Sequence, residues 1–85
     1  MFDYEKHQKE EIEYWKRRLD ETKKNVSSMS SEDLIDNLLY AHNDYTAYLN
    51  RDDGIYWSQK SEDYTGEIYF TLRNEIIHRM DHEPS

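Results

Sequence analysis

The 85-residue sequence contains no cysteine, which excludes a disulfide scaffold and any zinc site built on thiolates. Its two glycines, Gly54 and Gly66, cannot form a glycine-rich loop that cradles phosphate. No apolar run approaches the ~18 residues of a membrane span, and the polar first residues do not fit a secretory signal. A single-domain cytoplasmic protein without a membrane partner is therefore expected.

Large aliphatic residues are also scarce. Leu, Ile, Val and Phe together make up fifteen of the 85 residues, which is below the roughly one-fifth at which a highly charged chain becomes suspect for disorder. The twelve aromatic residues (two Trp, eight Tyr and two Phe) favour a folded domain, because each aromatic side chain can bury about 150–250 Å². We therefore predict a folded domain whose core depends on Tyr and Trp, with a partner or a second copy as one way to complete it.

Residues 3–26 are predicted to form one long helix. The segment contains no Gly or Pro, and its apolar positions recur at steps of three and four residues. Acidic residues also precede basic residues by four positions, as in Glu13 and Arg17, which favours a helix surface. The inward stripe comprises Ile12, Trp15, Leu19, Thr22 and Val26.

A second helix is predicted over residues 31–49. The serine-rich segment 27–31 separates it from the first helix, and Ser30 or Ser31 is a suitable N-cap. Glu32 and Asp33 then fall in the first turn, where the helix dipole favours acids. The expected inward face comprises Leu34, Ile35, Leu38, Leu39, His42, Tyr45 and Leu49.

The third predicted helix covers residues 61–81, with Ser61 as its N-cap. Its inward positions recur at steps of four: Ile68, Leu72, Ile76 and Met80. The alternation around Phe70 also fits a short strand, so a strand within residues 55–72 stays open. Residues 73–80 do not alternate, which favours the helix. The expected fold is thus an all-α, three-helix domain with a long N-terminal helix, in one domain over residues 1–85.

The sequence offers little support for catalysis or metal binding. Glu75, His78 and His82 could share one helix face, but the additional carboxylates of a di-metal site are missing. No nucleophile sits on a glycine-flanked turn. We expect a non-enzymatic protein without metal or cofactor.

Charge and tyrosine are concentrated in the last two thirds of the chain. Residues 1–26 carry seven acids and seven bases, so the whole net charge of −8 belongs to residues 27–85. An acidic surface carrying tyrosines favours a basic protein partner and disfavours direct binding of nucleic acid. The predicted partner-binding residues are Asp33, Asp36, Tyr40, Asp44, Tyr48, Asp52, Asp53, Tyr56 and Trp57.

In composition, the chain resembles the small, acidic, cysteine-free inhibitors that phages and mobile elements carry against host nucleases and defence complexes, anti-CRISPR proteins among them. That resemblance implies an inhibitor that occupies the nucleic-acid-binding surface of a basic protein in the host cytoplasm. It is compositional and involves no family motif. The first alternative is a structural protein that self-associates as a homodimer through Trp15 and Leu19 of the first helix. A solvated acidic face without a partner, or a helical adaptor for another protein, also fits the sequence.

Overall fold

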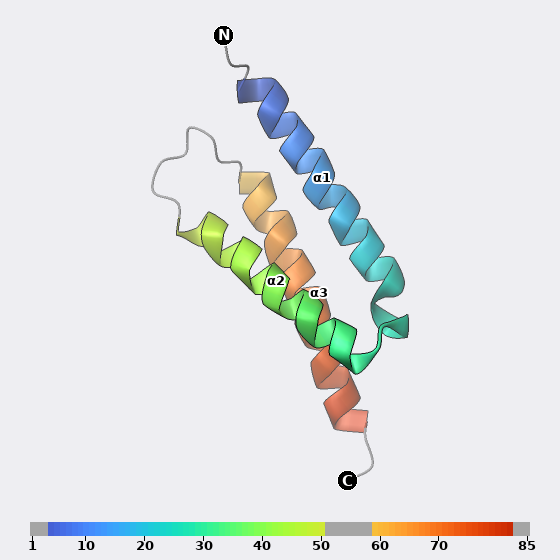
Figure 1. The fold of residues 1–85 in the computed structure, drawn as a ribbon. Helices are drawn as coiled ribbons and strands as arrows, with labels where there is room; N and C mark the ends of the chain where they lie inside the picture. The colour runs from blue at the N-terminus through green and yellow to red at the C-terminus, as the bar shows by residue number, and fades with distance from the viewer. Residues whose placement is uncertain (1–3, 51–58, 83–85) are drawn as a thin grey trace.

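The computed structural model describes residues 4–50 and 59–82, which form three α-helices (Figure 1). The all-α class and the long N-terminal helix are confirmed, and no strand occurs within these described residues. Each described helix begins and ends within two residues of its predicted boundary. The elements are α1 (Tyr4–Asn25), a short 3₁₀ turn η1 (Val26–Ser28), α2 (Ser31–Leu49) and α3 (Gln59–His82).

The caps of α2 and α3 differ in how well the sequence predicts them. Ser30 caps α2 as expected, because its side-chain oxygen accepts a hydrogen bond from the Asp33 amide at 3.1 Å. The prediction that Ser61 caps the third helix is wrong. Since α3 already begins at Gln59, Ser61 lies within the helix and is fully buried. There the Thr65 hydroxyl donates to the Ser61 carbonyl at 2.8 Å.

The helix α3 is the centre of the fold. It packs against both α1 and α2, while α1 and α2 meet at few points. Figure 1 shows α1 and α3 running in the same direction, with α2 crossing α3 in the opposite direction. The molecule measures 58 × 24 × 16 Å, so it is thin in one dimension. A body this thin leaves helix faces that no other helix of residues 4–50 and 59–82 covers.

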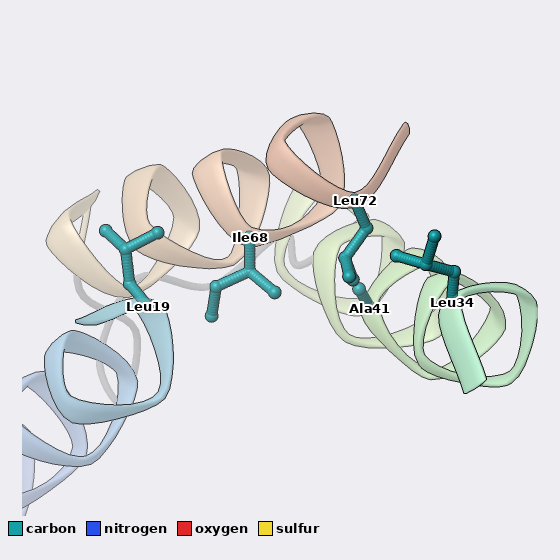
Figure 2. Close-up of a cluster of buried hydrophobic side chains, with 5 residues drawn as sticks. All are labelled: Leu19, Leu34, Ala41, Ile68 and Leu72. Carbon is teal, nitrogen blue, oxygen red and sulfur yellow. The ribbon is translucent and has the colours of Figure 1, made fainter. Parts of the chain in front are cut away.

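The buried apolar core is small and follows one side of α3. Leu19 of α1 and Ile68 of α3 fill the contact between those helices, whereas Leu72 of α3 packs with Leu34 and Ala41 of α2 (Figure 2). The buried cluster itself is aliphatic, so the prediction that the core depends on Tyr and Trp holds only for the partly buried residues around it, of which three are aromatic. The surrounding residues are Trp15, Val26, Met29, Leu38, Tyr64, Tyr69 and Ile76.

The predicted inward face of α2 is partly wrong. Leu34 is buried as expected, but Ile35 and Leu39 are 53% and 60% exposed, and His42 and Leu49 are exposed as well. The apolar arc of α2 is wider than the surface that α1 and α3 cover. Among the described residues, α1 and α3 cover the half of the arc that includes Ala41, and the half that includes Ile35 and Leu39 stays exposed.

The end of α3 also departs from the expected core. Ile68 and Leu72 are buried and Ile76 is half-buried, but Met80 is 69% exposed. Residues at steps of four advance by about 40° around a helix at each step. After three such steps from Ile68, Met80 has therefore rotated away from the core.

One long-range contact ties the connection between α1 and α2 to α3. The Arg79 guanidinium donates to the carbonyl oxygens of Val26 at 3.3 Å, Ser27 at 3.4 Å and Met29 at 2.6 Å. It also pairs with the carboxylate of Glu75 at 3.2 Å. Arg79 thus supplies donors to carbonyls at and just after the end of η1, where the Val26 carbonyl also accepts a hydrogen bond from the Met29 amide at 3.4 Å.

Candidate interaction surfaces

The outward side of α2 exposes three of the predicted partner-binding residues. Asp33, Asp36 and Tyr40 follow one another at steps of three and four, on the side of the helix away from Leu34. All three are exposed, and Tyr40 is 69% exposed. The structure therefore brings two carboxylates and one phenol together on a rigid helical surface, which we call the α2 acidic face.

The prediction that Tyr48 belongs to this exposed face is wrong. Tyr48 is only 8% exposed, because it lies two turns after buried Ala41 on the edge of α2 that faces α1. Its hydroxyl accepts a hydrogen bond from Trp15 Nε1 at 2.9 Å and donates to a carboxylate oxygen of Glu11. The phenol joins two helices of the same chain and is unavailable to a partner.

Asp44 is also less exposed than predicted, because its position on α2 faces the contact with the other helices. It is half-buried and, with Trp15, Ala41, Thr65 and Ile68, lines a very small space where the three helices meet. Burial raises the pKa of the Asp44 carboxyl above its ordinary value, and the positive charge of Arg18 partly opposes that rise. Its charge therefore contributes less to a partner than the charges of Asp33 and Asp36.

The predicted self-association residues lie inside the fold, and the last four predicted partner-binding residues lie outside the described part of the chain. Leu19 is 4% exposed in the core, and Trp15 packs against that core and bonds to Tyr48, so both are used within the chain. Beside them, Tyr14 is exposed and packs edge-on against Trp15 at 4.9 Å between ring centroids. Asp52, Asp53, Tyr56 and Trp57 lie outside the described residues.

The structure adds an acidic depression that the sequence analysis missed. It is open, has a volume of about 320 Å³, and lies between the first half of α3 and Tyr45 of α2. Gln59 donates to the carboxylates of Glu62 and Asp63 at 2.9 and 3.2 Å. The lining residues are Tyr45, Glu62, Asp63, Gly66, Glu67 and Phe70. Gly66 inside a predicted helix was the one sequence signal for a close approach here.

Gly66 accounts for the shape of this depression. A Cβ atom at this position would lie 2.9 Å from Cε1 of Tyr45, which is too close for an ordinary contact. The absent side chain lets the Tyr45 ring lie against α3, where it stacks on Tyr69 with centroids 6.0 Å apart and meets Phe70 edge-on at 6.2 Å. Carboxylates beside aromatic rings are the groups that Lys and Arg side chains contact.

Metal binding gains no geometric support among the described residues. The Glu75 carboxylate pairs with Arg79, and the side chain of His82 lies outside the described set. No group of three or more His, Asp or Glu side chains suited to a metal ion occurs in the described part of the chain.

Two further findings concern the chain as a whole. None of the helices described in residues 4–50 and 59–82 is long and apolar enough to cross a bilayer. Comparisons with protein-family models, curated proteins and solved structures found no match for this chain. Any proposal about function therefore depends on the surfaces described above.

Proposed function

We propose that this protein is a non-enzymatic, acidic inhibitor that binds the basic, nucleic-acid-binding surface of another protein. The observation that carries the proposal is the α2 acidic face, where exposed Asp33 and Asp36 precede exposed Tyr40 by two turns and one turn of the helix. A partner of this kind presents Lys and Arg, which pair with carboxylates and stack on phenol rings.

The spacing of the two carboxylates supports mimicry of a nucleic acid. Asp33 and Asp36 are separated by about 4.5 Å along the axis of α2 at 1.5 Å per residue. Successive phosphates of one DNA strand rise by roughly 3.4 Å along the duplex axis, so the axial step between the two carboxylates is somewhat longer but of the same order. Because both carboxylates are attached to one helix, their spacing is set before binding, which reduces the entropy lost on association.

The overall charge supports the same kind of partner. A net charge of −8 on 85 residues attracts a basic surface over a distance and repels nucleic acid. The second acidic group, formed by Glu62, Asp63 and Glu67 at the depression on α3, extends the negative surface beyond α2. Charge should set the association rate, whereas the contacts that Tyr40 makes inside the complex should set the dissociation rate.

The proposal is tested with the whole protein immobilised and a nuclease-treated host lysate as the source of partners. Proteins that elute with rising salt are identified, and the best candidate is then tested with purified components for competition by a DNA duplex. The variant D33K/D36K/Y40A should bind that candidate at least about tenfold more weakly than the unaltered chain.

The matched control reverses the exposed acids Glu13 and Asp20 on α1 in the variant E13K/D20K. It changes the net charge as much as D33K/D36K but leaves the α2 acidic face intact, so it should retain most of the affinity. If both variants lost the same affinity, net charge alone would explain the binding, and a specific role of the α2 acidic face would be contradicted. Direct binding of DNA or RNA by this chain, or a partner that DNA does not displace, would also refute the proposal.

A further inference from the structure

The side of the α2/α3 pair that α1 does not cover carries large apolar residues. Ile35 and Leu39 project from α2, and Phe70, Ile77 and Met80 project from α3; we call these five residues the α2/α3 strip. Ile35 and Met80 line one shared groove whose floor includes half-buried Ile76. Farther along, the ring of His42 meets that of Tyr69 with centroids 5.7 Å apart, so the two helices stay in contact beneath the strip.

The position of α1 explains why this strip is open. The α2 residues that approach α1 are Tyr48, through Trp15 and Glu11, and Asp44, beside Arg18. Ile35 and Leu39 lie on the opposite edge of the same helix, as their spacing from these residues requires. No other helix within the described residues covers that edge, and the side chains remain about half or more exposed.

The size of the strip matches what a stable homodimer requires. Taking about 150–200 Å² for each large side chain, the exposed fractions leave roughly 400–500 Å² of apolar surface. That lies in the middle of the roughly 300–600 Å² of the largest patch on an ordinary monomer, a patch that is often functional. A standard interface buries about 800 Å² on each partner, and about 65% of a homodimer interface is apolar. The strip supplies about that apolar share.

The charge of the strip indicates which partner covers it. On the same helical stripes, His42 and Thr46 follow Leu39 on α2 and Arg73 lies between Phe70 and Ile77 on α3, whereas exposed carboxylates (Glu32, Glu67 and Asp81) stand only at the ends of the strip. Among the described residues, the middle of the strip carries no carboxylate, so two copies of a chain with a net charge of −8 repel each other less on this face than on the α2 acidic face. We propose that the protein forms a two-fold symmetric homodimer through the α2/α3 strip.

The proposal is independent of the inhibitory function, because the strip and the α2 acidic face are different surfaces. Sedimentation equilibrium of the full chain in about 150 mM salt, where the Debye length is about 8 Å, should show its mass rising from one chain toward two over micromolar concentrations. A mass of one chain up to roughly 500 µM would overturn the proposal, because specific interfaces of about 1,600 Å² in total have dissociation constants in the micromolar range or tighter.

Two matched variants locate the interface. L39Q/M80Q replaces the two most exposed strip residues with helix-compatible polar residues and should weaken the dimer at least about tenfold. Y40Q alters a side chain as exposed as Met80 on the α2 acidic face and should leave the dimer unchanged. A dimer that is weakened by Y40Q and resists L39Q/M80Q would refute the assignment to the strip. Circular dichroism confirms that both variants keep their helices.

The absence of cysteine permits a second, direct readout. A single cysteine introduced by I77C is the only thiol of the chain, so a short bismaleimide can link only equivalent positions of two copies. A two-fold interface centred on the strip should give efficient linkage of I77C, and linkage should disappear when L39Q/M80Q is added. Tyr14 on α1 provides the control, because Y14C should link poorly. The reverse pattern would indicate self-association through the first helix and overturn the proposal.

Discussion

Arg79 is expected to contribute more to stability than any other charged residue of α3, because its guanidinium joins α3 to the connection between α1 and α2. Its strongest contact is the 2.6 Å hydrogen bond to the Met29 carbonyl, and the bonds to Val26 and Ser27 at 3.3 and 3.4 Å are weaker. The pair with Glu75 lies within one helix and is partly exposed, so it adds only a few tenths of a kcal/mol.

Arg79→Ala should therefore lower the free energy of unfolding by about 2 kcal/mol, mainly through the loss of a charged hydrogen bond. In a domain of this size, 1 kcal/mol corresponds to about 4–8 °C in Tm, so the midpoint should fall by about 8–16 °C. Arg79→Lys should recover less than half of this loss, because an ammonium group cannot reach several carbonyls in fork geometry. Urea and thermal unfolding followed by helical circular dichroism measure both changes.

The control for this prediction is Arg73→Ala, which removes an exposed arginine from the same helix. It should change stability by less than about 0.5 kcal/mol. If Arg79→Ala and Arg73→Ala give the same midpoint at low protein concentration, the guanidinium contacts do not stabilise the fold and the reasoning is wrong.

Three other substitutions test the packing of the helices. Gly66→Ala should destabilise the protein by about 1 kcal/mol, despite the higher helix propensity of Ala, because the Tyr45 ring must move; a more stable variant would show that the ring shifts freely. Tyr48→Phe should lower the free energy of unfolding by about 1–3 kcal/mol in urea denaturation, because it removes the hydroxyl that accepts a hydrogen bond from Trp15 Nε1 and donates one to the Glu11 carboxylate. Asp44→Asn should stabilise the protein at neutral pH, because burial raises the pKa of Asp44 and its ionised form disfavours the native state. This advantage should shrink as pH falls through the native pKa toward the ordinary value of 3.8, and an advantage that is constant with pH would contradict it.

The sequence by itself determined the helices, because the signals for them are local. The three- and four-residue spacing around Trp15 and Leu19 and the Ser30 cap depend on neighbours within a few residues, and the structure retains them. The exposure of Asp33, Asp36 and Tyr40 followed from the same periodicity, since these residues lie opposite Leu34 on α2.

Tertiary structure alone decided which residues of each helix face the interior. The apolar arc of α2 includes both Ile35 and Leu34, and periodicity cannot tell which half another helix covers. The position of α1 buries Tyr48 and half-buries Asp44, although both fit a solvent-exposed pattern. The Arg79 contacts join residues about fifty positions apart, which no local signal reports. A helix is a local property of the chain, whereas burial depends on where the other helices lie.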